Sequence, residues 1–190
     1  AEDKPRFGGS LLTSDVNIGN QTGVEWTEKI IAELKSMPNV TVKNRSQVFG
    51  YYDHNMLVMS ERISDHLPKT QKYLPKQRLW YIRANEVLIS SGSIERPLVF
   101  GNNDTPGVML SSAAKEYMKV YGVLVGKKPL IFTNNDSGYE TAIEFKKNGV
   151  NPIILDTRSN PSSDIITEAK NLNIEIKFSY VVVAAKGYKK

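Results

Sequence analysis

Two acidic residues followed by paired glycines open the sequence, and this arrangement could bind a nucleotide. Glu2 and Asp3 each stand six residues before a glycine of the pair Gly8 and Gly9. In dinucleotide-binding folds an acid that ends the second strand accepts hydrogen bonds from ribose hydroxyls, while a G-x-G-x-x-G turn binds the pyrophosphate. The acid is present here and that glycine turn is absent. The segment predicts either the end of a strand that begins upstream or an acidic tail, and the residues alone leave both open.

A second pattern typical of a ligand-facing strand end lies in residues 85–110. Residues 87–90 (VLIS) form a short apolar run, and Ser91 and Gly92 follow at once. Small residues at a strand end let a ligand or a second backbone come close. We therefore expect a buried strand over residues 87–90, with a close contact at Ser91 and Gly92. The Pro, Asn, Asp and Gly residues that follow predict an ordered turn system.

A third candidate site is the segment TNNDSG, residues 133–138, between a predicted strand and a predicted helix. A nucleotide fold has its glycine-rich phosphate turn at this place, but Gly138 is the only glycine of the segment. Asp156 ends the next predicted strand, where a ribose-binding acid would stand. The alternatives are a second nucleotide site and a Rossmann-like scaffold or docking surface. The scaffold is favoured, because the Asn-Asn-Asp run would crowd and repel a pyrophosphate.

The first half of the chain is predicted to contain a helix and an antiparallel insertion. A Thr-x-x-Glu capping box at Thr22 and helical spacing of apolar residues predict a helix over residues 23–37. Residues 40–42 are predicted to begin a strand. Residues 47–52 and 55–61 predict a hairpin around Asp53 and His54, and residues 78–83 predict a further strand. His54 is interpreted as a solvent-facing turn residue, since no nucleophile is implied beside it.

The second half alternates strands and helices, the order of a parallel α/β sheet. Ser111 and Ser112 are predicted to cap a helix that Gly122 ends. The other predicted strands are residues 129–133, 152–156, 175–178 and 180–184, and the other helices are residues 139–147 and 164–172. We expect a Rossmann-like α/β fold in two domains. Residues 1–110 form a partial dinucleotide-binding fold without its first strand and glycine turn, and residues 111–190 form a second βαβ lobe that is truncated at its C-terminus.

Composition excludes several classes of function. The 190 residues contain no cysteine and two histidines, so disulfides, thiolate sites and Cys nucleophiles are excluded and a metal site is not expected. The net charge of +5 comes from scattered basic residues without interleaved aromatics, which argues against nucleic acid and leaves an anionic small molecule possible. No apolar run reaches the roughly 20 residues of a membrane span. With no signal-peptide pattern at the start, we expect a cytoplasmic protein without membrane contact.

Four motifs together resemble the α subunit of heterotetrameric sarcosine oxidase. They are FGGSLL, VFGYYDHN, SGSIERPLVFGNNDTPGVML and TNNDSGYETAIEFKKNGV, in this order. Paired glycines are common to many flavoproteins, so ERPLVFGNNDTPGVML and TNNDSGYETA carry most of the specificity. The resemblance covers essentially all 190 residues. It implies that the chain is the middle of a much longer subunit and part of its disulfide-reductase-like, FAD/NAD(P)-binding region.

The resemblance also implies a function for the whole enzyme. That family demethylates sarcosine oxidatively to glycine and hydrogen peroxide and passes the one-carbon unit to tetrahydrofolate. Its β subunit holds FAD, FMN lies between α and β, and the α subunit holds NAD. We therefore assign no catalytic residue here and expect a role in NAD binding and in assembly with the other subunits. The alternatives are a subunit-docking module without nucleotide and a disulfide-reductase-type enzyme, whose redox pair the absence of cysteine argues against.

Individual roles follow from the same resemblance. Glu2 would accept the adenosine ribose hydroxyls, with Asp3 as its near alternative, and Gly9 and Ser10 would line the phosphate and ribose edge. Val48 would meet adenine through its backbone. Ser91 and Gly92 match an Ala-Thr-Gly-like element in which Ser91 keeps the hydroxyl.

Two further expectations concern Arg96 and the isolated piece. Arg96 would either meet an anionic group or anchor the turn, and the turn is favoured because Glu95 offers a charge partner. Because the pyrophosphate-binding turn is missing, we expect the 190 residues alone to bind NAD or FAD weakly or not at all. Exposed sheet edges would allow this piece to self-associate.

Overall fold

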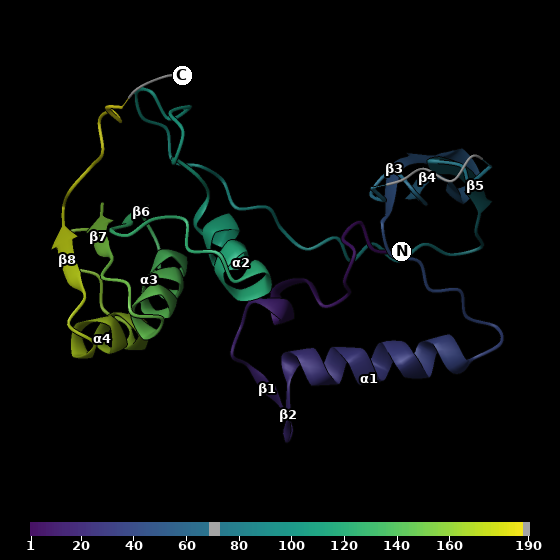
Figure 1. Ribbon diagram of the computed structural model, residues 1–190, viewed down its shortest axis with the longest axis horizontal. Coiled ribbons are helices and arrows are strands. Elements are labelled where there is room, and N and C mark those ends of the chain that lie inside the picture. The colour runs from purple at the N-terminus through teal and green to yellow at the C-terminus, as the bar shows by residue number, and fades with distance from the viewer. Residues whose placement is uncertain (69–72, 188–190) are drawn as a thin grey trace. The chain divides into compact units, whose positions relative to one another are not determined.

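A computed structural model describes residues 1–68 and 73–187 (Figure 1). The chain divides into two compact units, Ala1–Gly92 and Ser93–Lys190.

The first unit begins with short elements that lead into one long helix. The 3-10 helix η1 (Gly9–Leu12) is followed by the two-residue strands β1 (Asn17–Ile18) and β2 (Gln21–Thr22) and by α1 (Gly23–Ser36). The predicted capping box is confirmed: Thr22 Oγ1 accepts from the Glu25 amide at 3.2 Å, and the Glu25 carboxylate accepts from the Thr22 amide at 2.8 Å. These two bonds satisfy backbone donors that the first turn of a helix leaves free, so the predicted helix forms where expected.

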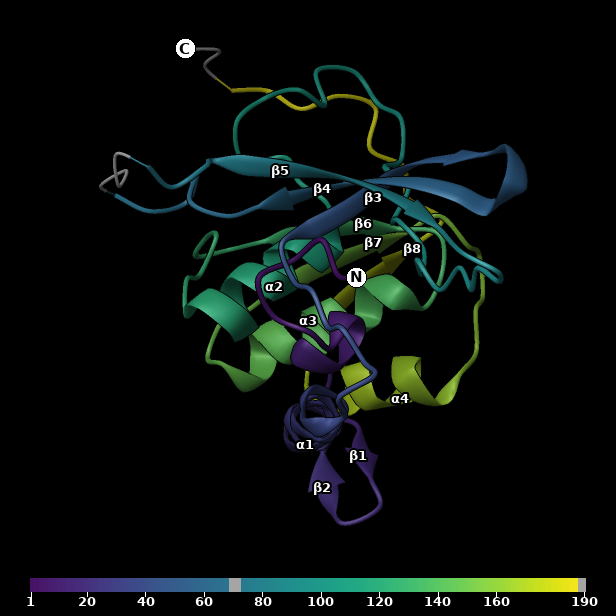
Figure 2. The ribbon, with the colours of Figure 1, turned by 90° about the vertical axis from the view of Figure 1, so that its right-hand side faces the viewer.

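A three-stranded antiparallel sheet completes the first unit (Figure 2). The strands are β3 (Ser46–Tyr52), β4 (Met56–Arg62) and β5 (Gln77–Arg83), paired in the order β3-β4-β5. The predicted hairpin and third strand are therefore confirmed. The turn between β3 and β4 is a short 3-10 segment in which His54 has φ 57° and Asn55 has φ 52°. His54 is exposed at this turn, as predicted.

Two predicted strands of the first unit are wrong. Residues 40–42 form no strand, and residues 87–90 pair with no strand of the described chain. Val87 is half-buried, whereas Leu88 is 93% exposed and Ile89 is 68% exposed. A strand needs a neighbour whose backbone takes up its hydrogen bonds, and no neighbour in the described chain pairs with either segment. The close contact expected at Gly92 is also missing, because a Cβ added there would meet nothing within 4 Å.

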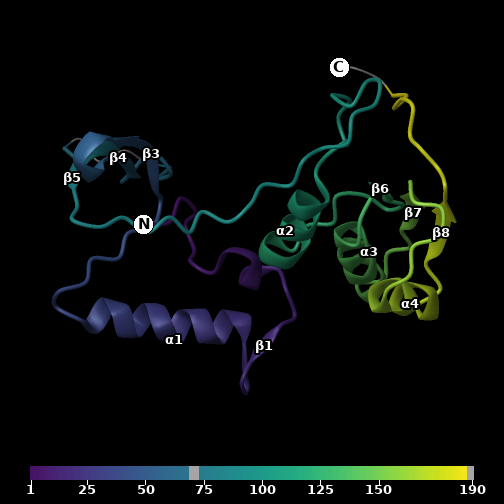
Figure 3. The ribbon, with the colours of Figure 1, turned by 180° about the vertical axis from the view of Figure 1, so that it is seen from behind.

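The second unit is a parallel βαβαβ arrangement preceded by a helix (Figures 1 and 3). Its elements are α2 (Ser111–Tyr121), β6 (Leu130–Thr133), α3 (Ser137–Lys147), β7 (Ile153–Asp156), α4 (Asp164–Asn171) and β8 (Glu175–Phe178). The parallel order β6-β7-β8 places Thr133 beside Asp156 and Asp156 beside Phe178. The carboxyl ends of all three strands therefore meet at one edge. The predicted strand over residues 180–184 is wrong except for one isolated bridge between Gly101 and Ala184.

The hydrophobic core of the described chain lies almost wholly in the second unit. Among residues 1–68 and 73–92 of the first unit, only Val58 and Met59 are buried hydrophobic residues, so this part of the chain has little core of its own. In the second unit Gly138 sits against β6, where an added Cβ would lie 2.7 Å from the Thr133 Cβ. Glycine thus allows α3 to approach the sheet closely. The buried cluster consists of Ala114, Met118, Ile131, Tyr139, Ala142, Ile143, Phe145, Val150, Ile154, Ile166, Ala169 and Ile174.

Candidate functional site

The predicted ribose acid, Glu2, lies beside the start of strand β3. Its amide donates to the Lys43 carbonyl at 2.8 Å, and its carbonyl accepts from the Ser46 amide at 2.8 Å. The structure therefore brings Glu2 close to the strand that carries Val48. The Glu2 carboxylate accepts one local hydrogen bond, from the Lys4 amide at 3.0 Å. Lone pairs of this half-buried carboxylate remain for a further donor.

Asp3, the alternative acid, is engaged differently. Its carboxylate lies 3.1 Å from Arg62 Nη2, and the same guanidinium donates to the Asp3 carbonyl. The Asp3 side chain is 57% exposed, so this ion pair contributes little to stability. It nevertheless turns the carboxylate toward β4. Of the two acids, Glu2 is the one whose carboxylate has no cation as partner in the structure as described.

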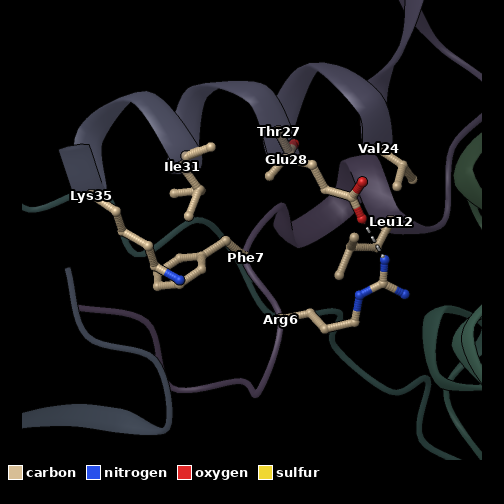
Figure 4. Close-up of a pocket in the computed structure, with 9 residues that line it drawn as sticks. Arg6, Phe7, Leu12, Val24, Thr27, Glu28, Ile31 and Lys35 are labelled. Carbon is tan, nitrogen blue, oxygen red and sulfur yellow. Dashed lines mark hydrogen bonds and ion pairs between the residues drawn. The ribbon is translucent and has the colours of Figure 1, made fainter.

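Gly9 and Ser10 lie in η1, and Leu12 of the same 3-10 helix lines a pocket between the N-terminal segment and α1 (Figure 4). The pocket has a volume of about 310 Å³, and its lining is mainly apolar. Arg6 and Glu28, which both line this pocket, form an exposed ion pair at 3.4 Å (Figure 4). The sequence did not indicate this pocket, because its walls come from separate elements. The lining residues are Arg6, Phe7, Leu12, Val24, Thr27, Glu28, Ile31, Ala32 and Lys35.

Ser91 and Gly92 are not brought to the other predicted site residues of the first unit. Both are exposed, and Gly92 has φ +70°, a conformation that favours glycine whatever surrounds it. No hydrogen bond among the described residues joins them to Glu2, Ser10 or Val48. The first unit thus brings Glu2 close to β3 and leaves Ser91 and Gly92 on an extended, solvated segment.

In the second unit, side chains already occupy the turn that corresponds to a phosphate site. Thr133 Oγ1 accepts from the Asn135 amide at 3.2 Å and donates to the Asn135 carbonyl at 2.8 Å. Asn135 Oδ1 accepts from the Ser137 amide at 2.9 Å and from its hydroxyl at 2.6 Å. Backbone amides at such a turn are the donors that a pyrophosphate would need. Here the amides of Asn135 and Ser137 already donate to side chains of the turn itself.

Asp156, the candidate ribose acid of this unit, is fully buried and bound to an arginine. Its carboxylate accepts from Tyr139 Oη at 2.7 Å and from Arg158 Nη2 at 2.8 Å and Nε at 3.0 Å. Arg158 Nη1 also lies 2.8 Å from Asp136 Oδ1, in the turn after β6. We call Asp136, Tyr139, Asp156 and Arg158 the Arg158 cluster. It joins the carboxyl ends of β6 and β7 and leaves Asp156 no freedom to bind a ribose, which favours the scaffold interpretation of this unit.

The electrostatics of the Arg158 cluster fix its protonation at neutral pH. Burial by itself would raise the pKa of Asp156, but hydrogen bonds from Arg158 and Tyr139 lower it below its ordinary value. Hydrogen bonds from Arg158 and Ser163 likewise lower the pKa of Asp136. Burial and the hydrogen bond to Asp156 raise the pKa of the Tyr139 hydroxyl. Both carboxyl groups are therefore ionised, and Tyr139 is a neutral donor.

The sequence suggested that Glu95 is the charge partner of Arg96. In the structure, Glu95 instead caps the N-terminus of α2. Its carboxylate accepts from the Ser111 amide at 3.1 Å and from the Ser112 amide at 2.7 Å. Partial burial opposes ionisation of Glu95, yet the hydrogen bonds from Ser112 and Ser111 lower its pKa overall. A carboxylate at a helix N-terminus is stabilised by the free amides and the helix dipole, which explains why Glu95 points to α2. The serines therefore receive a cap and do not supply one.

Two classes of site are not found in the described ranges. No group of three or more His, Asp or Glu side chains in residues 1–68 and 73–187 could hold a metal ion. Within the same ranges, no helix is both long enough and apolar enough to cross a membrane.

Comparison with curated proteins gives three relatives with one name. The chain is 43% identical over 152 residues to sarcosine oxidase subunit alpha of Rhizobium meliloti (strain 1021), a match over 80% of this chain and 15% of the relative. It is 33% identical over 184 residues to the protein of that name from Corynebacterium sp. (strain P-1), over 96% of this chain and 19% of the relative. The resemblance expected from the motifs is confirmed, and the chain corresponds to a fragment of these much longer relatives. No family model matches the chain.

Comparison with solved structures supports the predicted fold class. L-proline dehydrogenase from P. horikoshii matches with a TM-score of 0.62 at 19% identity, over 86% of this chain and 31% of that one. The HOCl-induced flavoprotein disulfide reductase from Escherichia coli, in the Cu(II) complex of a mutant, matches with a TM-score of 0.61 at 18% identity. The match covers 96% of this chain and 42% of that one. At such identities the likeness shows the fold alone. The Rossmann-like α/β fold of FAD/NAD(P)-binding oxidoreductases, as expected from the sequence, is confirmed.

Proposed function

We propose that this chain, which is similar over most of its length to a segment of sarcosine oxidase subunit alpha, helps to bind NAD in a longer oxidoreductase subunit. The observation that carries the proposal is the 43% identity over 152 residues. The chain spans only 15–19% of the length of the relatives described above, so the whole reaction belongs to the longer protein. In that protein, sarcosine would be demethylated oxidatively with FAD and FMN held outside this chain, and folate would receive the one-carbon unit.

The residues of the first unit suit the adenosine part of a dinucleotide better than its pyrophosphate. Glu2 presents a carboxylate with unused lone pairs beside β3, which suits ribose hydroxyls as donors. Gly9 and Ser10 would follow the phosphate and ribose edge, the Val48 backbone would meet adenine, and Ser91 and Gly92 would complete the cleft. Because the chain has no G-x-G-x-x-G turn, its pyrophosphate donors would come from elsewhere in the longer subunit.

A structural and subunit-docking role without nucleotide is the second candidate, and the Arg158 cluster favours it for the second unit. Two backbone amides of the turn after β6 and the acid that ends β7 already have partners within the chain. Such a unit offers a stable surface at the place where related folds hold a ligand. The proposed partners are the other subunits of the oxidase in the cytoplasm, and the isolated piece would associate with itself through its unpaired segments.

The experiment that tests NAD binding compares Glu2→Gln with Glu33→Gln in the full-length subunit by calorimetry. A charged hydrogen bond contributes about 1.5–3 kcal/mol, so Glu2→Gln is expected to weaken NAD binding roughly tenfold or more. Glu33 is exposed on α1 and is the matched control. An unchanged NAD affinity of Glu2→Gln would contradict the assigned role. Subunit assembly that persists in a full-length protein unable to bind NAD would favour the docking role.

A further inference from the structure

We propose that Arg62 is a positioning residue, which holds the turn over residues 2–4 and through that turn directs the Glu2 carboxylate toward the ribose of the nucleotide. The proposal rests on the proposed function, in which Glu2 accepts the adenosine ribose hydroxyls. Arg62 ends β4 and stands 59 residues after Asp3, so no local motif of the sequence connects it with the acids.

The direction of the Glu2 carboxylate depends on a tight local turn. Glu2 Oε1 accepts a hydrogen bond from the Lys4 amide at 3.0 Å, so the side chain is tied to the backbone two residues further on. Asp3 is the middle residue of this turn. A side chain that bonds to its own backbone is oriented only as firmly as that backbone is held. The group that holds Asp3 therefore decides where the Glu2 carboxylate points.

The Arg62 guanidinium holds Asp3 at two atoms. Arg62 Nη2 donates to the Asp3 carbonyl and also to the Asp3 carboxylate, the latter at 3.1 Å. The Asp3 carbonyl and the Lys4 amide belong to one planar peptide group. Arg62 therefore fixes the peptide whose amide hydrogen points at Glu2. The bond to the carboxylate keeps Asp3 on Arg62 and leaves Glu2 as the acid with lone pairs for a ligand.

Backbone bonds attach this turn to the sheet at the place where Arg62 lies. The Arg45 amide donates to the Lys4 carbonyl at 3.1 Å, and the Arg62 amide donates to the Arg45 carbonyl at 2.9 Å. Arg62 thus contacts the turn through its side chain, and through its backbone it contacts the residue to which the turn is bonded. The turn, the residue before β3 and the end of β4 form one hydrogen-bonded assembly.

Arg45 has a strained backbone in this assembly. Its φ is 51°, in the left-handed region that residues with a side chain rarely adopt. Such a conformation persists only where the surrounding structure determines it, and conformations of this kind concentrate at ligand sites. Here the bonds to Lys4 and from Arg62 occupy both backbone groups of Arg45. The strain is consistent with a geometry that serves binding.

The exposure of the ion pair separates a positioning role from a purely structural one. The Arg62 side chain is 39% exposed and that of Asp3 is 57% exposed. An ion pair so exposed contributes little to folding stability. If Arg62 were only structural, its replacement should change little. A positioning residue should change nucleotide binding without a comparable change in stability.

The test compares two ligands by calorimetry in the full-length subunit: NAD, and NAD whose adenosine ribose lacks the 2′-hydroxyl. The wild-type subunit should bind NAD about tenfold or more tightly than the deoxy ligand, because that hydroxyl donates to a charged carboxylate. In Arg62→Met this ratio should fall to about threefold or less, while the thermal midpoint stays within about 2 °C of the wild-type value. Arg62→Lys keeps a charged donor and should retain a larger ratio than Arg62→Met.

Arg78→Met is the matched control. Arg78 lies on β5 with its side chain 51% exposed, 3.6 Å from Glu61, and in the described part of the chain it forms no hydrogen bond or ion pair with residues 2–4. Its replacement should leave the ligand ratio at the wild-type value. An unchanged ratio in Arg62→Met, or an equal loss in Arg78→Met, would overturn the proposal. Loss of folding in both Arg62 variants would assign Arg62 a structural role and overturn it as well.

The wild-type measurement separates this proposal from the proposed function. A wild-type subunit that binds both ligands equally would contradict the role of Glu2 at the ribose, and the proposal for Arg62 would fail with it. A wild-type subunit that prefers NAD, beside an Arg62→Met variant with the same preference, would leave the role of Glu2 standing and refute the role of Arg62 alone.

Discussion

Replacement of Arg158 by methionine is expected to destabilise the second unit strongly. Methionine keeps much of the length of the side chain and removes its charge and donors. The fully buried Asp156 would keep the Tyr139 hydroxyl and the Arg158 backbone amide as donors and would lose its cation. Asp136 would lose its ion pair at the same time.

The expected magnitude follows from the burial of the two partners. Removal of one partner from a fully buried ion pair costs about 3–5 kcal/mol. Arg158 is 31% exposed, so water can partly solvate the space that it leaves. We therefore expect a loss of about 2–3 kcal/mol in the free energy of unfolding. In a domain of this size the corresponding fall in Tm is roughly 10–20 °C.

Two optical signals separate the units in this experiment. Trp26 and Trp80 are the two tryptophans of the chain, and both belong to the first unit. Urea unfolding followed by far-UV circular dichroism reports helices of both units, while tryptophan fluorescence reports the first unit. Arg158→Met should move the circular dichroism transition much more than the fluorescence transition. Arg96→Met, an exposed arginine of the same unit, is the control and should change stability by less than about 0.5 kcal/mol.

The pH dependence of folding stability should change direction in Arg158→Met. In the wild-type protein the pKa of Asp156 is lowered, so its ionised form contributes stability at neutral pH that is lost as the pH falls below about 4. Without Arg158, burial should raise the pKa of Asp156, and the stability of the variant should increase as the pH falls from 7 toward 4. A loss below about 1 kcal/mol at pH 7, or parallel pH profiles of variant and wild type, would refute the reasoning.

Two other substitutions test packing and capping in the second unit. Gly138→Ala should lower the free energy of unfolding by about 1–3 kcal/mol in denaturation experiments, because its Cβ would lie 2.7 Å from the Thr133 Cβ. Gly126→Ala is the control and should not lower it, because an added Cβ there meets nothing within 4 Å. Equal effects of the two substitutions would exclude steric overlap as the cause. Glu95→Gln should cost about 0.5–2 kcal/mol at neutral pH through loss of the charged cap on α2. Because the pKa of Glu95 is lowered in the folded protein, this difference should shrink and then disappear as the pH falls through that pKa. An unchanged thermal midpoint of Glu95→Gln at pH 7 would contradict the capping role.

Local patterns in the sequence determined much of the fold. The capping box at Thr22, the hairpin around His54 and the βαβ order of the second half were predicted correctly, because each depends on residues close together in the chain. The strand over residues 87–90 was predicted wrongly, because an apolar run forms a strand only beside a partner and no strand of the described chain pairs with it. Tyr180 and its neighbours failed as a strand for the same reason, apart from the bridge at Ala184.

For the candidate sites, the sequence determined which residue types are available, and the tertiary structure decided which of them are free to act. Glu2, Asp3, Asp136 and Asp156 are all carboxylates near predicted strand ends, and their residue types and positions alone do not show which of them are already paired within the chain. Pairing depends on partners that are brought together only by folding: Arg62 lies at Asp3, and Arg158 bridges Asp136 and Asp156. The energy of a carboxylate depends on its burial and on the cations within a few ångströms, which are properties of the fold and not of local sequence.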